Sequence, residues 1–229
     1  MWQYFFISAC SIILTLFIVF LVLRNRKPKT IVIEKERPKM NTVKKWSYRQ
    51  NLGFKTTWGR YYTEYSLAIN NLLEDSYQGN VTVLALPVLF LIRHSLELAF
   101  KMNLIDLQQL SGENATIDYS GKTAHVLHKL HDEFERQVHL IFAKEKISAI
   151  IVKDFNKRND ELRNFRKIFD QLDNWSYAFR YPVKNDGMTK SFDKNDEINI
   201  ANIIPIYRET EIILKYTIDV LTDPASKSK

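Results

Sequence analysis

Residues 81–110 read VTVLALPVLFLIRHSLELAFKMNLIDLQQL, and this stretch decides how the rest of the chain can fold. It is apolar on almost every side of a helix, which predicts a helix covered by other helices. Its middle part carries four charged or titratable residues close together: Arg93, His94, Glu97 and Lys101. At about 100° per residue these four fall within a sector roughly 100° wide.

Such side chains must pair with one another or face something polar, because burying an unpaired charge costs several kcal/mol. One interpretation is an ion pair between Arg93 and Glu97, four residues apart, that fixes the register of the helix. The other is a polar functional groove lined by the same residues. The sequence leaves both interpretations open.

Four further segments have apolar residues at helical spacing and can surround the central helix. They are residues 58–77, 123–142, 147–172 and 198–221. Glycine is rare, with six in the chain, and the domain shows no strand alternation. The sequence therefore predicts an all-α bundle of about five helices with short antiparallel connections. Residues 173–196 form the one long loop of this prediction, and such loops often line functional sites.

The N-terminal segment predicts a transmembrane helix over residues 1–23. Residues 2–23 contain no charge and would span about 33 Å as a helix, enough to cross a bilayer. No basic residue precedes this stretch, which favours an uncleaved anchor over a signal peptide. Residues 24–60 hold twelve Lys/Arg and two acidic residues, which predicts a basic juxtamembrane linker at 24–57. The positive-inside rule then places the N-terminus outside the inner (plasma) membrane and the rest in the cytoplasm.

The chain beyond the linker is expected to form one helical domain, residues 58–222, followed by a disordered tail at 223–229. Residues 61–229 carry 21 basic and 24 acidic residues, so the pI of about 9.3 reflects the linker. The single cysteine, Cys10, lies in the predicted anchor, which excludes disulfides and cysteine-based sites from the domain. No Walker loop, dinucleotide fingerprint or serine triad occurs, and we expect no cofactor and no metal.

Three short motifs follow one another along this domain. They are Arg93-His-x-x-Glu with Lys101, then Thr123-Ala-His125, then Phe179-Arg-Tyr-Pro182. Their order resembles the HEPN-like helical domain superfamily over residues 58–222. This resemblance implies a HEPN-like helical bundle that forms a homodimer.

The resemblance also implies an RNA-targeting effector in anti-phage defence or a toxin–antitoxin system. Many members are metal-independent ribonucleases with an Arg-x(4–6)-His motif, which this sequence lacks. A catalytic site would then be composite, built from the residues of the three motifs: Arg93, His94, Glu97, His125 and Arg180. Such a ribonuclease needs a histidine-like base for the 2′-hydroxyl proton and a cation for the scissile phosphate. A non-catalytic binding or sensing module and a membrane adaptor are the alternatives.

Basic and aromatic residues near these motifs are candidates for contact with RNA. They are Lys101, Arg158, Arg163, Arg166, Lys167 and Tyr181. The basic residues of segment 147–172 alternate with acidic ones, which is also typical of a solvated face with ion pairs. We further expect Arg180 to pair with Glu97. The expected partners are the lipid bilayer, a second copy of the chain, and RNA or a protein encoded nearby.

A stripe of His125, His128, Asp132 and His139 on one side of segment 123–142 also suggests a metal site. This stripe lies opposite the apolar face of the predicted helix. We therefore expect this stripe to face solvent rather than a metal ion. His125 is instead expected to be the histidine that opens the helix in the family that the chain resembles.

Overall fold

The computed structural model describes residues 56–73, 84–173, 176–184, 186–193 and 197–227. Within these ranges the protein consists of five α-helices and two short 3₁₀ turns, with no strand. The elements are α2 (Trp58–Leu72), α3 (Ala85–Ser111), η2 (Lys122–His125), α4 (Leu127–Glu145), α5 (Ala149–Asp173), α6 (Ile200–Thr222) and η3 (Pro224–Ser226). The predicted all-α bundle is confirmed for the part of the chain that the structure describes.

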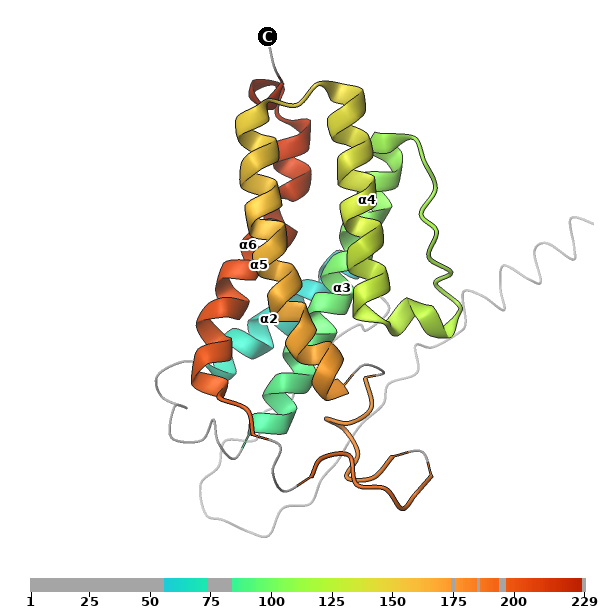
Figure 1. The fold of residues 1–229 in the computed structure, drawn as a ribbon, viewed down its shortest axis with the longest axis vertical. Coiled ribbons are helices and arrows are strands. Elements are labelled where there is room, and N and C mark those ends of the chain that lie inside the picture. Colours follow the sequence, from blue (N-terminus) through green and yellow to red (C-terminus); the bar gives the residue numbers. More distant parts are fainter. Residues whose placement is uncertain (1–55, 74–83, 174–175, 185, 194–196, 228–229) are drawn as a thin grey trace, which may run out of the picture. The chain divides into compact units, whose positions relative to one another are not determined.

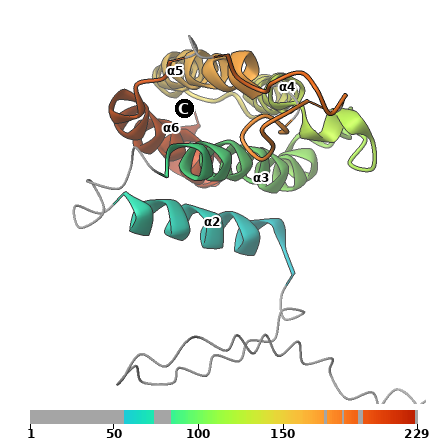
Figure 2. The same cartoon turned by 90° about the horizontal axis from the view of Figure 1, so that it is seen from below.

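Helix α3 lies at the centre of this bundle. Figure 2 shows three layers, with α2 alone, α3 and α6 in the middle, and α4 and α5 beyond them. Helix α3 packs against α2, α4 and α6, so it meets another helix on most of its sides. This explains why its sequence is apolar around almost the whole helix.

The direction of α4 differs from the prediction. In the first half of α3, Arg93 Nη2 donates a hydrogen bond to the His125 carbonyl just before α4. Near their ends, Lys144 Nζ of α4 donates to the Leu110 carbonyl of α3. Helices α3 and α4 therefore run in the same direction, and the connection 112–126 returns along the bundle (Figure 1). At about 3.3 Å per residue this connection is long enough to pass α4, so the predicted short antiparallel connection was wrong here.

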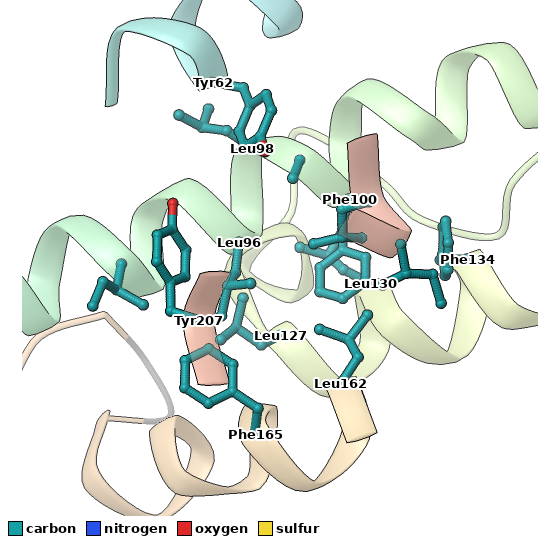
Figure 3. Close-up of a cluster of buried hydrophobic side chains, with 14 of the residues drawn as sticks. Tyr62, Leu96, Leu98, Phe100, Leu127, Leu130, Phe134, Leu162, Phe165 and Tyr207 are labelled. Carbon is teal, nitrogen blue, oxygen red and sulfur yellow. The ribbon is translucent and has the colours of Figure 1, made fainter. Parts of the chain in front are cut away.

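The hydrophobic core lies between α3 and the helices around it. Figure 3 shows Phe100 of α3 beside Phe134 of α4, with their ring centroids 5.7 Å apart and edge to face. Phe165 of α5 meets Tyr207 of α6 at 6.4 Å. Burying a side chain of this size contributes about 1.5–3 kcal/mol, so the contacts among helices supply most of the stability.

Residues 223–227, the described part of the expected disordered tail, are ordered. Residues Pro224–Ser226 form η3, and the buried Ser226 accepts a hydrogen bond at its carbonyl from Ser148 N at 2.9 Å. Lys227 Nζ lies 2.6 Å from Glu145 Oε2. These contacts hold the C-terminal segment against the turn between α4 and α5.

The predicted transmembrane helix at residues 1–23 lies outside the described residues, as does the linker apart from residues 56–57. Among the helices from residue 56 onward that the structure describes, none is sufficiently long and apolar to span a bilayer.

Candidate functional site

The side chain of Arg93 joins the first two sequence motifs and contacts the end of α5, just before the third motif. It is fully buried, and its Nη1 lies 3.4 Å from Glu97 Oε2 on the same helix. Its Nε donates to the Asp173 carbonyl at the end of α5, and its Nη2 donates to the His125 carbonyl of η2, both at 2.8 Å. The predicted Arg93–Glu97 ion pair is therefore confirmed. The same guanidinium also fixes η2 and the end of α5 against α3.

Glu97 is the charged centre of the site. Its side chain is only 2% exposed, and its Oε1 lies 2.8 Å from both Lys101 Nζ and His125 Nδ1. Burial alone would raise the pKa of Glu97, but the hydrogen bond and charge of Lys101, together with His125, lower it below its ordinary value. Glu97 is therefore an ionised carboxylate with three cationic or titratable partners.

His125 is the member of this cluster that reaches solvent. Its side chain is 57% exposed, while Arg93 holds its backbone carbonyl and Glu97 holds its Nδ1. Because an ionised carboxylate only accepts hydrogen bonds, a neutral His125 carries its proton on Nδ1. The unprotonated Nε2 is then available as a base. This buried carboxylate thus sets both the orientation and the tautomer of an exposed imidazole.

Lys101 is buried, contrary to its expected role in RNA contact. Its Nζ bonds to Glu97 and lies 5.1 Å from the ring centroid of Trp58 at the start of α2. Trp58 in turn stacks on Tyr119 of the α3–α4 connection, with centroids 6.3 Å apart. Arg93 is likewise too deeply buried to touch a substrate. Both cations neutralise Glu97 rather than face solvent.

Asp173 positions the Phe-Arg-Tyr-Pro turn. Its carboxylate accepts hydrogen bonds from the backbone N–H groups of Tyr177 and Ala178 at 2.6 and 3.0 Å. Arg180 Nε donates to the Ser176 carbonyl at 2.7 Å, which closes the turn.

The guanidinium of Arg180 lies over two rings, 5.7 Å from the centroid of Phe90 and 5.3 Å from that of Tyr181. Arg180 and Tyr181 are both exposed. Among the described residues, the ion-pair partners of Glu97 are Arg93, Lys101 and His125. The expected Arg180–Glu97 pair was therefore wrong, because Arg180 instead bonds to the Ser176 carbonyl and lies over Phe90 and Tyr181.

His94 is a packing residue rather than an exposed base. Its ring meets Tyr65 edge to face at 4.6 Å and stacks on Phe90 at 5.7 Å. Burial lowers the pKa of His94 below its ordinary value, while the negative charge of Glu97 acts in the opposite direction. His94 is thus held as a neutral ring beside the cluster.

The three arginines of α5 are engaged in ion pairs. Arg158 Nε lies 2.9 Å from Asp154, Arg163 bonds to Glu135 of α4, and Arg166 bonds to Asp170. Arg166 is buried, so its predicted contact with RNA was wrong, whereas Lys167 is exposed. The alternative interpretation, a face with ion pairs, is confirmed for these arginines.

A cavity elsewhere in the bundle does not have His125 in its walls. This cavity, of 230 Å³ and with mainly apolar walls, lies between the first half of α5 and the second half of α6. No group of three or more His, Cys, Asp or Glu in the described ranges has the arrangement to hold a metal ion.

Sequence reasoning missed three contributors to the site: Asp173, Trp58 and Tyr119. For Asp173 a signal existed, since an aspartate at the end of a helix and just before a turn is a frequent backbone cap. Trp58 and Tyr119 gave no such signal, because their position depends on how α2 and the connection pack. Comparisons with protein-family models, curated proteins and solved structures found no match to this chain.

Proposed function

We propose that the chain is a membrane-anchored effector whose HEPN-like cytoplasmic domain cleaves RNA at His125. The observation that carries the proposal is the contact between Glu97 Oε1 and His125 Nδ1, 2.8 Å long, which presents an exposed imidazole. The resemblance of the three motifs to HEPN-like domains supports RNA as the target. A defence or toxin–antitoxin setting and a homodimeric form are part of the same proposal.

The chemistry needs no metal. Nε2 of His125 removes the proton of a ribose 2′-hydroxyl, and the 2′-oxygen attacks the adjacent phosphorus. A new P–O2′ bond forms while the P–O5′ bond breaks, and the leaving 5′-oxygen takes a proton from the imidazolium. The products are a 2′,3′-cyclic phosphate and a 5′-hydroxyl end. The exposed guanidinium of Arg180 is the candidate cation for the phosphate.

The buried charges have a supporting role in this proposal. Glu97 keeps Nδ1 of His125 protonated and stabilises the imidazolium that forms when Nε2 takes a proton. Arg93 fixes the His125 backbone, and Lys101 balances the charge of Glu97. A carboxylate that orients a histidine is a recurring arrangement in hydrolytic sites.

A binding module is the second candidate, and one observation favours it. Arg93 has protein partners at all three of its guanidinium nitrogens, so it cannot act as the arginine of an Arg-x(4–6)-His ribonuclease. In that case His125 and Arg180 would recognise a ligand or a protein partner without cleaving it.

The membrane location is a proposal that rests on residues 2–23 and the basic segment that follows them. Protease treatment of sealed inner-membrane vesicles tests it. The domain of an N-out protein lies on the cytoplasmic face, so it should be digested only where that face is exposed.

Cleavage is tested with the purified full-length protein in detergent, 5′-labelled total RNA and an excess of EDTA. We expect cut RNA with 2′,3′-cyclic phosphate ends. His125→Ala should lower the rate by at least about 100-fold, since general acid–base catalysis contributes that much or more. The matched control is His139→Ala, which removes another exposed histidine, on α4, and should leave the rate unchanged. Uncut RNA at high protein concentration would instead favour the binding module.

A further inference from the structure

The cavity of 230 Å³ between α5 and α6 contains none of the residues proposed for RNA cleavage. Ser148 N, just before α5, donates to the Ser226 carbonyl, just after α6, so the start of α5 lies beside the end of α6. The cavity lies between these two helix ends, and Phe142 of α4 also lines it. Three helices therefore form its walls.

The buried residues of these walls are apolar. Phe155 of α5 and Ile213 and Leu221 of α6 are 7%, 5% and 4% exposed. Phe142 packs edge to face on Phe155, with the ring centroids 5.3 Å apart. The hydroxyl of Thr217 already donates to the Ile213 carbonyl at 2.6 Å. The inner part of the cavity therefore favours an apolar group, because a polar group there would lose its hydrogen bonds to water.

The cavity opens to solvent between two different edges. The α6 edge consists of Ile212, Tyr216 and Val220, which are 41%, 54% and 39% exposed. Helix α6 rises about 12 Å over these eight residues, so the opening is elongated. The α5 edge consists of Asp154 and Arg158, whose side chains are 58% and 40% exposed. A ligand in the opening thus meets apolar surface on one side and a charged pair on the other.

The charged edge has unused hydrogen-bonding capacity and little net charge. Arg158 Nε donates to Asp154 Oδ2 at 2.9 Å, and neither side chain forms a hydrogen bond with any other described residue. The terminal nitrogens of Arg158 can therefore donate to a ligand, and Asp154 Oδ1 can accept. A hydroxyl group suits this edge because it does both. A carboxylate would face the charge of Asp154, and an ammonium group would face that of Arg158. The charges of Glu161 and Glu209 also act on Arg158, so a carboxylate is the least favoured of the three.

The volume limits the ligand to a small molecule. An apolar cavity of about 150 Å³ accepts a benzene ring with its six heavy atoms, so 230 Å³ accepts about nine at the same density. Pockets for drug-sized ligands measure about 300–1,000 Å³, so a whole membrane lipid does not fit.

We propose that this cavity binds a small uncharged amphiphile, an aliphatic chain of about eight carbons that ends in a hydroxyl group. The chain lies between the apolar walls of α5 and α6, where the elongated opening favours it over a ring. Its hydroxyl group meets Asp154 and Arg158. The proposal goes beyond the proposed function, since none of these residues takes part in the chemistry at His125.

Photolabelling of the full-length protein in nanodiscs tests the proposal without detergent, whose alkyl chains would compete for the cavity. The probe is 1-octanol with a diazirine group on its chain, and peptide mass spectrometry locates the label. We expect saturable labelling within residues 142–158 and 212–221, lowered at least about tenfold by excess 1-octanol. Octanoate and octylammonium should compete only at concentrations at least about threefold higher, with octanoate the weaker of the two.

Three variants locate the site and test the hydroxyl group. Val220→Trp places a larger ring over the opening from an exposed position and should lower the label at least about fivefold, because the ring takes the volume of the ligand. The matched control is Ile206→Trp, at a position of α6 that is 39% exposed and outside the cavity, and it should keep the wild-type label. Asp154→Asn removes the negative charge of the edge, so octanoate should compete at least about threefold better than it does in the wild type.

The label overturns the proposal if it spreads over the protein in proportion to exposure and does not saturate. So does a wild-type label in Val220→Trp, provided that circular dichroism shows an unchanged helix content. Should Val220→Trp unfold, competition by 1-octanol and the change in Asp154→Asn still decide. Octanoate or octylammonium that competes as well as 1-octanol would contradict the uncharged ligand. Each result is independent of whether the protein cuts RNA.

Discussion

Glu97 of α3 and Glu211 of α6 are buried carboxylates with a lysine four residues later, yet their surroundings differ. Glu97 bonds to the buried Lys101 and to His125, whose side chain is 57% exposed. Glu211 bonds to the part-exposed Lys215 and to hydroxyl groups of α2 and α6. The same spacing therefore orients a solvent-facing imidazole in one region and joins packed helices in the other.

The Glu211 region shows what a purely structural cluster looks like in this fold. Glu211 Oε1 accepts hydrogen bonds from Ser66 and Tyr207 at 2.7 Å and from Tyr62 at 3.1 Å. Burial raises the pKa of Tyr62 and of Tyr207 far above the ordinary range, with the charge of Glu211 adding to the effect. These hydroxyls stay protonated and bind the carboxylate. Nothing in the cluster is both titratable near neutral pH and exposed.

The largest expected effect is a loss of stability when Glu97 is removed, and it should exceed the loss when Glu211 is removed because the two carboxylates have different partners. Glu97→Ala leaves Arg93 and Lys101 buried without a counter-charge, so the free energy of unfolding should fall by about 3–5 kcal/mol. Glu211→Ala leaves mainly neutral hydroxyls unpaired and should lower it by about 1–3 kcal/mol. Denaturant unfolding of the full-length variants in detergent, followed by circular dichroism, measures both. Equal losses would show that charge burial does not distinguish the two regions.

A smaller effect concerns His131, a buried histidine of α4 that neither carboxylate contacts in the described structure. Its ring stacks on Phe100 at 5.2 Å, and its Nε2 lies 2.7 Å from Asn159 Oδ1. Burial lowers the pKa of His131 to about 3, although the hydrogen bond with Asn159 acts in the opposite direction. The charges of Arg163 and Arg166 also disfavour the protonated ring.

Because the pKa of His131 is lower in the folded protein than in the unfolded chain, the unfolded chain binds the proton first. The stability that depends on neutral His131 is complete above about pH 6.5 and is lost as the pH falls toward 3. Between pH 6.5 and 5 this group should lower the unfolding free energy by up to about 1.4 kcal/mol per pH unit. His131→Gln should remove that part of the slope, and His139→Gln should not. If the unfolding free energy of His131→Gln still fell with pH as steeply as that of the wild type, His131 would not be the group responsible.

The smallest expected effect on stability is that of Arg180→Ala. Arg180 is exposed, and its contacts are one backbone carbonyl and two rings, so the unfolding free energy should change by about 1 kcal/mol or less. The thermal unfolding midpoint compared with that of Glu211→Ala measures it. A loss larger than that of Glu211→Ala would make the turn a structural element of the same kind as the Glu211 cluster.

Local patterns predicted the helices well, because helix periodicity depends on residues a few positions apart. The predicted segment 147–172 became α5 (Ala149–Asp173), and 198–221 became α6 (Ile200–Thr222). Segment 123–142 differed more, since its first residues form the 3₁₀ turn η2 before α4 begins. A 3₁₀ turn at the start of a helix has no apolar period of its own, so the sequence did not reveal it.

The partners of the charged residues were harder to predict, because they lie far apart in the chain. The Arg93–Glu97 pair was predictable from its spacing on one helix. The contact of Glu97 with His125 spans 28 residues, and that of Arg93 with the Asp173 carbonyl spans 80. No periodicity connects such positions. The same limitation produced the wrong Arg180–Glu97 pair and concealed the burial of Arg166.

The amino-acid sequence alone determined that the described domain is helical and that α3 is its buried helix with paired charges. Both follow from local physics. Apolar residues at helical spacing predict the helix, and the free-energy cost of burying an unpaired charge predicts that each buried charge has a partner. Only the tertiary structure decided that His125 meets Glu97 and faces solvent. That outcome depends on the connection 112–126, which runs back along the bundle and sets α4 parallel to α3 (Figure 1). The path of a connection is set by the sum of many weak packing contacts, which no local pattern contains.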